Sequence, residues 1–172
     1  AAPDHGQLMP WRFVLVPTNQ RAALGDVFQQ ALCARDPLAT ADQLAQAREK
    51  AFRAPVLLLL VVDGERGDPD IDLHERLISA GCAVQNMLLM ATALGFGSAI
   101  TSGKALKSAP LRSLFGLKAQ EHAPWFVSLG TVQSSRPARA RPVPGDCVTV
   151  LGGAPPSPQP LHNESFHEHH LL

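Results

Sequence analysis

The sequence has no net charge of either sign, no long hydrophobic run and few cysteines. Its 15 basic residues balance its 15 acidic residues, and the pI is about 7.2. This balance excludes a generally basic surface of the kind that binds nucleic acid. The longest apolar run, Val56 to Val62, has seven residues, against the ~20 that a membrane-spanning helix needs. We therefore expect no nucleic-acid partner and no membrane partner.

The cysteines and the N-terminus bear on the cellular compartment. Cys33, Cys82 and Cys147 are odd in number, far apart and without CxxC spacing, which indicates unpaired thiols in a reducing compartment. Residues 1–7 show no charged lead followed by an apolar core, so no signal peptide is expected. With 172 residues, 45% of them hydrophobic, the chain is expected to be a cytoplasmic globular protein with one real core.

Composition changes sharply near residue 137. Seven of the 15 prolines lie between residues 137 and 160, and four of the seven histidines lie between residues 162 and 170. Proline removes a hydrogen-bond donor and fixes φ, so few regular elements are expected there. We expect one domain over residues 1–151 and a Pro/His-rich C-terminal tail over residues 152–172.

Hydrophobic periodicity predicts helices and strands in the first 136 residues. Strands are expected at residues 12–16, 56–62, 96–101 and 125–131. Helices are expected around residues 24–32 and at residues 40–53, 70–94 and 108–115. Strand 56–62 is continuously apolar, as in a strand covered on both faces. The pattern predicts an α+β or α/β fold with a small sheet around a central helix.

The central helix is the most apolar part of the chain. Beyond Ala80 it carries apolar residues nearly all round, including Val84, Leu88, Leu89 and Met90. A helix of this kind is expected to be buried on most sides. Cys82 lies in this stretch and is expected to be an inert, packed thiol.

Several possible chemical sites fail on their residues. Residues 98–105 (SAITSGKA) lack the first glycine of the phosphate loop and the hydroxyl after its lysine. The C-terminal histidines lack the spacing of HExxH, and no metal site is expected. No Ser/His/Asp or Cys/His arrangement can be assigned, so the catalytic residues stay unknown. The arginines at positions 136, 139 and 141 suit either a phosphate-bearing ligand or a solvated surface.

Four segments in order resemble motifs of the nitroreductase-like flavoprotein family. Residues 2–13 (APDHGQLMPWRF) resemble the segment A-P-[SD] running into P-W-x-F. Residues 79–91 (SAGCAVQNMLLMA) resemble the central helix S-x-G-x-A-x-Q-N-x-L-L-x-A. Residues 95–103 resemble the following strand, which commonly ends in W-R-[TS]-G, and residues 126–131 (FVSLGT) resemble the last core strand.

The resemblance implies a fold, a function and a set of site residues. The fold would be an α+β, nitroreductase-like three-layer fold, in which helices flank a small, mostly antiparallel sheet around a long central helix. Two chains would form an intertwined homodimer. The function would be that of an FMN-dependent oxidoreductase. NADH or NADPH would deliver hydride to the flavin, and a small-molecule electron acceptor, nitroaromatic or quinone, would take the electrons in a ping-pong cycle. The residues that match cofactor-binding positions are His5, Ile100, Thr101, Ser102, Arg139 and, as second choice for phosphate, Arg136.

The sequence also departs from the family pattern. The family's first helix carries R-R-S, which holds the flavin phosphate and ribityl chain, and the sequence begins after that segment. Ile100 and Thr101 stand where the family has W-R. The alternative is therefore a flavin-free binding or interaction protein on a nitroreductase fold.

Overall fold

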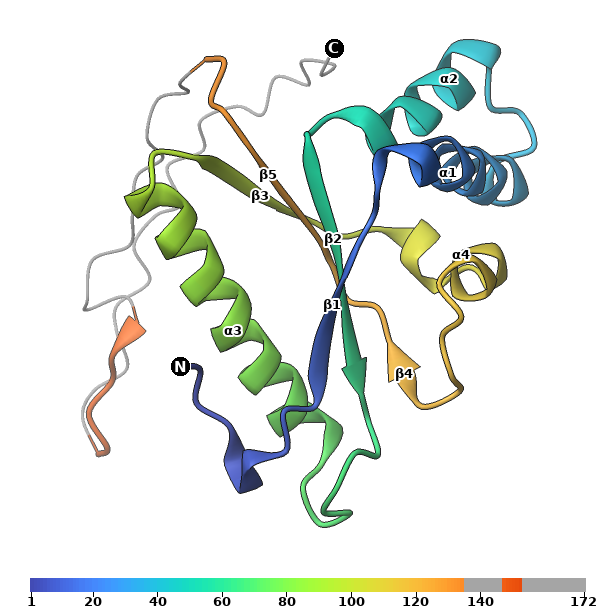
Figure 1. Ribbon diagram of the computed structural model, residues 1–172. Coiled ribbons are helices and arrows are strands. Elements are labelled where there is room, and N and C mark those ends of the chain that lie inside the picture. Colours follow the sequence, from blue (N-terminus) through green and yellow to red (C-terminus); the bar gives the residue numbers. More distant parts are fainter. Residues whose placement is uncertain (135–146, 153–172) are drawn as a thin grey trace. The chain divides into compact units, whose positions relative to one another are not determined.

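The computed structural model describes residues 1–134 and 147–152 (Figure 1). Residues Ala1–Gln133 form one compact unit. Residues 147–152 belong to a second unit and are exposed along their whole length. The predicted boundary at residue 151 stays a prediction.

The compact unit is built on a small antiparallel sheet. Its strands are β1 (Trp11–Leu15), β2 (Val56–Asp63), β3 (Gly97–Thr101), β4 (Glu121–His122) and β5 (Phe126–Gly130). The order is β1-β2-β5-β3, with β4 also pairing β2, and all these pairs are antiparallel. The four predicted strands are confirmed, and the two-residue β4 was missed.

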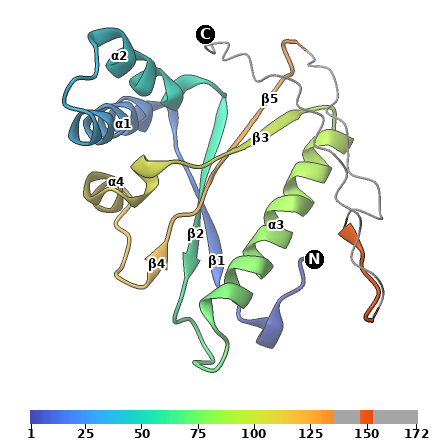
Figure 2. The ribbon, with the colours of Figure 1, turned by 180° about the vertical axis from the view of Figure 1, so that it is seen from behind.

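Helices cover both faces of this sheet. They are α1 (Arg21–Arg35), α2 (Ala41–Glu49), α3 (Leu73–Ala93) and α4 (Ala109–Leu114). Short 3-10 turns are η1 (His5–Gln7), η2 (Thr18–Gln20), η3 (Lys50–Phe52) and η4 (Lys104–Lys107). Both ribbon views place α1, α2 and α4 on one side of the sheet and α3 on the other (Figures 1 and 2). The predicted three-layer α+β fold is confirmed.

The sequence of β2 explains the three layers. Successive side chains of a strand point to opposite faces. Leu57, Leu59 and Val61 enter the core beneath α1 and α4, whereas Leu60 and Val62 enter the core beneath α3. An apolar run without alternation is thus buried on both faces, as predicted.

The central helix α3 begins later than predicted. Asp72 is its N-cap, and its carboxylate accepts hydrogen bonds from the backbone N–H groups of His74 and Glu75 at 2.7 and 3.2 Å. Asp70 lies in the preceding loop, where its own N–H donates to Asp68. Gly95, with φ of +80°, follows the C-terminus, as expected for a helix stop. None of the described helices is long and apolar enough to cross a bilayer.

The prediction that α3 is buried on most sides is wrong for the single chain. Ser79, Ala80, Val84 and Ala91 face the core. Ile78, Leu89 and Met90 are nevertheless 58–67% exposed, and Cys82 is half-buried. Composition shows that the helix is apolar nearly all round, but it does not show whether its apolar side chains are buried by the same chain or by another one.

Candidate functional site

The turn that carries His5 is tightly wound and lies against α3. The Asp4 carboxylate accepts a hydrogen bond from the Met9 backbone N–H at 2.7 Å, which closes the turn. Gly6, Gln7 and Met9 have φ of +68°, +52° and +43°. Left-handed backbone at two non-glycine residues is uncommon and costs free energy. The surrounding contacts must therefore hold this turn in place.

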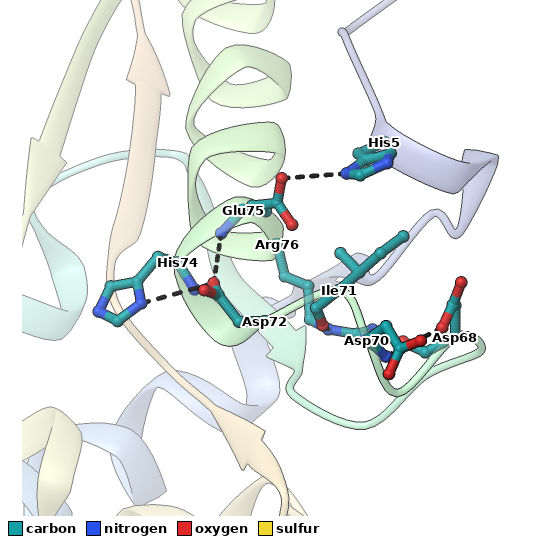
Figure 3. Close-up of polar contacts among 8 residues, drawn as sticks. All are labelled: His5, Asp68, Asp70, Ile71, Asp72, His74, Glu75 and Arg76. Atoms are coloured by element: carbon teal, nitrogen blue, oxygen red, sulfur yellow. Dashed lines mark hydrogen bonds and ion pairs between the residues drawn. The ribbon is translucent and has the colours of Figure 1, made fainter.

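The side chain of His5 makes a polar contact with the first turn of α3. Its Nδ1 lies 3.0 Å from Oε1 of Glu75, and the His5 side chain is otherwise 65% exposed (Figure 3). The backbone of Glu75 is itself held in place, because its N–H donates a hydrogen bond to the Asp72 carboxylate. The backbone N–H groups of Glu75 and His74 lower the pKa of Asp72 below its usual value. The Asp72 carboxylate therefore stays ionised at the N-terminus of α3, which is the positive end of the helix dipole.

The second predicted segment is the end of β3. Ile100 is 40% exposed, and Thr101 and Ser102 are exposed as well. Ile100 pairs with Val127 of β5, so its side chain shares the α3 face of the sheet. Among the described residues β3 pairs only with β5. Its other edge therefore presents main-chain N–H and C=O groups that have no partner strand in the described chain.

The single chain does not bring these two segments together. In both ribbon views η1 and the C-terminal end of β3 lie well apart (Figures 1 and 2). The predicted phosphate ligands, Arg139 and Arg136, lie outside the described residues, as do the histidines beyond residue 160. Within residues 1–134 and 147–152, no cluster of three His, Cys, Asp or Glu side chains is arranged to hold a metal ion.

Two residues that contribute to the His5 turn were missed by the sequence reasoning. Glu75 pairs directly with His5, and Arg76 is 1% exposed beneath the loop that contacts the turn. A signal for Arg76 was present in the sequence. Leu73, Leu77 and Ala80 form an apolar stripe, and position 76 falls on it at helical spacing. A charged residue on an apolar stripe indicates a buried group with specific partners.

The fold defines a class of three-layer α+β proteins, and comparison with known proteins gives the family. The sequence model of the Nitroreductase family matches residues 1–131, and this chain belongs to that family.

Two curated relatives carry provisional names as NAD(P)H nitroreductases. YdjA of Escherichia coli strain K12 is 35% identical over 134 residues, 77% of this chain and 70% of YdjA. A Haemophilus influenzae Rd protein is 30% identical over 151 residues, 87% of this chain and 81% of that protein.

Solved structures confirm the fold. A nitroreductase-like family protein from Bacillus cereus superimposes with a TM-score of 0.71 at 17% identity, covering 88% of this chain and 79% of that one. A variant of NfnB from Sphingopyxis sp. strain HMH, named as an FMN and NADPH-dependent nitroreductase, gives a TM-score of 0.65 at 20% identity. That match covers 89% of this chain and 84% of the NfnB chain. At these identities the likeness concerns the fold alone.

Proposed function

We propose that this protein is an FMN-dependent oxidoreductase that passes hydride from NADH or NADPH through flavin to a nitroaromatic or quinone acceptor. The observation that carries the proposal is the family match over residues 1–131. The names of the curated relatives support the nicotinamide part of the proposal, and the name of NfnB supports the FMN part. When bound, FMN supplies the two-electron chemistry, and the protein supplies binding, orientation and electrostatics.

The proposed protein is a homodimer, and the exposed side of α3 supports this part. Large apolar side chains of α3 and of the segment after it are at least half exposed: Ile78, Leu89, Met90, Leu94 and Phe96. An apolar patch of this kind on a soluble protein marks an interaction site. A second copy packed on α3 would complete the burial that the helix composition predicts. It would also explain why the His5 turn and the end of β3 lie apart in one chain, since each flavin would contact His5 from one protomer and β3 from the other.

The described residues fit the ring system of FMN. Its pyrimidine end carries N–H and C=O groups that match the hydroxyls of Thr101 and Ser102 and the main-chain edge of β3 that pairs with no strand among the described residues. Ile100 adds an exposed apolar side chain on the same strand. His5 would approach from the partner, with Nδ1 already directed at Glu75. The phosphate is assigned to Arg139 and, as second choice, Arg136, on the family resemblance.

The proposal extends to boundaries and compartment. The flavin domain would span residues 1–151, with residues 152–172 as a tail that the cofactor does not need. The three cysteines are free, which suits a reducing compartment, and we place the protein in the cytoplasm.

The visible spectrum of the purified full chain tests the cofactor. Bound oxidised flavin absorbs in the blue, stays with the protein through gel filtration and is bleached by NADH or NADPH in the absence of air. A nitroaromatic or quinone acceptor should restore the colour. A protein that stays colourless after incubation with FMN would overturn the proposal. It would favour the alternative, a flavin-free binding protein. The presence of Ile100 and Thr101 where the family has W-R already supports that alternative.

A further inference from the structure

The first turn of α3 contains a buried guanidinium whose partners all belong to the preceding loop. Arg76 is 1% exposed. Its Nε donates to the Ile71 carbonyl at 2.9 Å, its Nη2 donates to the Asp68 carbonyl at 2.6 Å, and its Nη1 donates to the Arg66 carbonyl. A planar guanidinium directs these donors in a fixed fork. Arg76 therefore ties three points of the loop over residues 66–71 to the helix.

The loop that Arg76 holds packs directly on the turn that carries His5. A methyl group on Gly6 would lie 2.7 Å from Cδ1 of Ile71, and a methyl group on Gly67 would lie 2.6 Å from Cδ2 of Leu8. Real side-chain carbons do not approach so closely, so each glycine is in close contact with a side chain of the other segment, with no space for a larger residue. Figure 3 shows His5 directed at Glu75 beside this loop.

We propose that Arg76 is a positioning residue of the flavin site, acting through the loop over residues 66–71 on the turn that carries His5. This inference rests on the proposed function, because it takes His5 as a flavin contact. The pair between His5 and Glu75 is 65% and 44% exposed, and a solvated pair of this kind is too weak to hold a left-handed turn by itself. The buried hydrogen bonds of Arg76 supply the rigid support.

The arrangement also sets which nitrogen of His5 is presented. A carboxylate only accepts hydrogen bonds, so the contact with Glu75 makes Nδ1 the donor. Nε2 is then the nitrogen available to the partner protomer's flavin, as an acceptor while the ring is neutral. Arg76 places the ring, and Glu75 sets its tautomer.

The chain offers a matched control for a test of Arg76. Arg21 is also a buried arginine, 4% exposed, and it donates to main-chain carbonyls of Val16, Ala51 and Pro55. It lies in α1, on the opposite side of the sheet from α3 (Figure 1). Replacing it removes the same kind of interaction without touching the His5 turn.

The experiment compares Arg76→Met with Arg21→Met in the full-length protein. The dissociation constant for FMN is measured by flavin fluorescence, at a temperature where both variants are folded. A displaced His5 would lose its contact with the flavin, and we expect about a tenfold loss of FMN affinity in Arg76→Met. Arg21→Met should change it less than about twofold. Equal losses in the two variants would reduce Arg76 to a general stabilising role and overturn the inference.

A double mutant tests the route through His5. If Arg76 acts through His5, adding His5→Ala to Arg76→Met should weaken FMN binding little beyond Arg76→Met alone. Additive losses would contradict that route. If Arg76→Met does not fold, Arg76→Lys takes its place. Lysine retains the charge but loses the planar fork that joins the three carbonyls, so this variant is expected to weaken FMN binding and to be non-additive with His5→Ala.

A readout without flavin separates this inference from the proposed function. Backbone hydrogen exchange at residues 5–9 should rise in flavin-free Arg76→Met and stay unchanged in Arg21→Met. Unchanged exchange in Arg76→Met would overturn the positioning role even if the wild-type protein binds FMN. A wild-type protein that binds no FMN, with exchange at the turn rising as expected, would defeat the proposed function and the flavin role of Arg76, while Arg76 would still be shown to hold the turn.

Discussion

Replacing Glu121 by glutamine should destabilise the fold, and the effect should depend on pH. The Glu121 carboxylate is 8% exposed. Its Oε1 accepts hydrogen bonds from Nε and Nη2 of Arg12 at 3.1 and 2.9 Å, and its Oε2 accepts one from the Lys118 backbone N–H at 2.9 Å. These contacts join β1 to the turn before β4. The substitution retains the size of the side chain and removes its charge.

The contacts set the size of the effect. A hydrogen bond to a charged group contributes about 1.5–3 kcal/mol. The Arg12 side chain is 47% exposed, so water can replace its hydrogen bonds when the carboxylate charge is removed. The contribution of these bonds to stability therefore lies at the low end of this range. The glutamine amide would also place a donor against the Lys118 N–H if it kept an acceptor for Arg12. We expect Glu121→Gln to lower the free energy of unfolding by about 2 kcal/mol at pH 7.

The pKa of Glu121 gives the pH dependence. Burial by itself would raise this pKa, but the hydrogen bonds from Lys118 and Arg12 outweigh burial and lower it. A lowered pKa in the folded state stabilises the fold above the ordinary glutamate pKa of about 4.3, and this stabilisation is lost as the pH falls through the folded-state value. The difference between wild type and Glu121→Gln should therefore be constant above about pH 6 and shrink below about pH 4.

Urea unfolding at several pH values from 7 down to about 3.5 measures this difference across the range where the carboxylate takes up its proton. Glu65→Gln is the control, because Glu65 is an exposed residue of the loop after β2 and should change stability little at any pH. A cost for Glu121→Gln that is the same at both ends of this pH range would refute the electrostatic reasoning. A variant as stable as wild type at neutral pH would refute the assignment of a stabilising role to these contacts.

Four further changes test other contacts and parts of the proposed function. Gly25→Ala should lower the unfolding free energy by about 1–3 kcal/mol although alanine favours helices, because the new methyl group would lie 2.9 Å from Cγ of Arg48; a more stable variant in urea would contradict this. Thr40→Ala removes the capping box of α2 and should cost about 1 kcal/mol, whereas Thr40→Ser should cost less; equal losses would argue against the cap. Leu89→Glu places a charge on the exposed side of α3 and should shift the protein toward monomer in sedimentation; an unchanged dimer would exclude Leu89 from the interface. Arg139→Ala should weaken binding of FMN by about tenfold more than binding of riboflavin, which lacks the phosphate; equal losses would contradict a phosphate role.

Local patterns predicted the helices and strands well and their ends less well. The apolar run at residues 56–62 is β2, and the periodic stretch predicted at 70–94 is α3, which spans Leu73–Ala93. The helix begins after its N-cap Asp72, later than residue 70, because the conformation of the preceding loop fixes the start and periodicity alone does not. The strand β4 has two residues, too few for any period, and it exists because Glu121 and His122 meet β2.

The candidate site was predicted less completely than the fold. The resemblance led to His5 and to the end of β3, and both are exposed at the surface of the chain. The resemblance implied that they contact the flavin from opposite sides of a subunit interface, but it did not predict that Glu75 faces His5. That pair is separated by 70 residues in the sequence, so no local pattern records it. Its existence depends on how the N-terminal turn packs on α3.

The amino-acid sequence by itself indicated a small sheet around a central helix through hydrophobic period, and the family with its three-layer α+β fold through the resemblance of its motifs. Both signals could be read because they lie in residues that are close together in the chain. Only the tertiary structure decided which main-chain carbonyls the buried charges meet and which side of α3 stays open. The apolar stripe of α3 marks position 76, but only the folded chain shows that Arg21 and Arg76 are both buried against main-chain carbonyls. Burial of a charge depends on partners that the folded chain brings to it, and those partners are set by packing between distant segments.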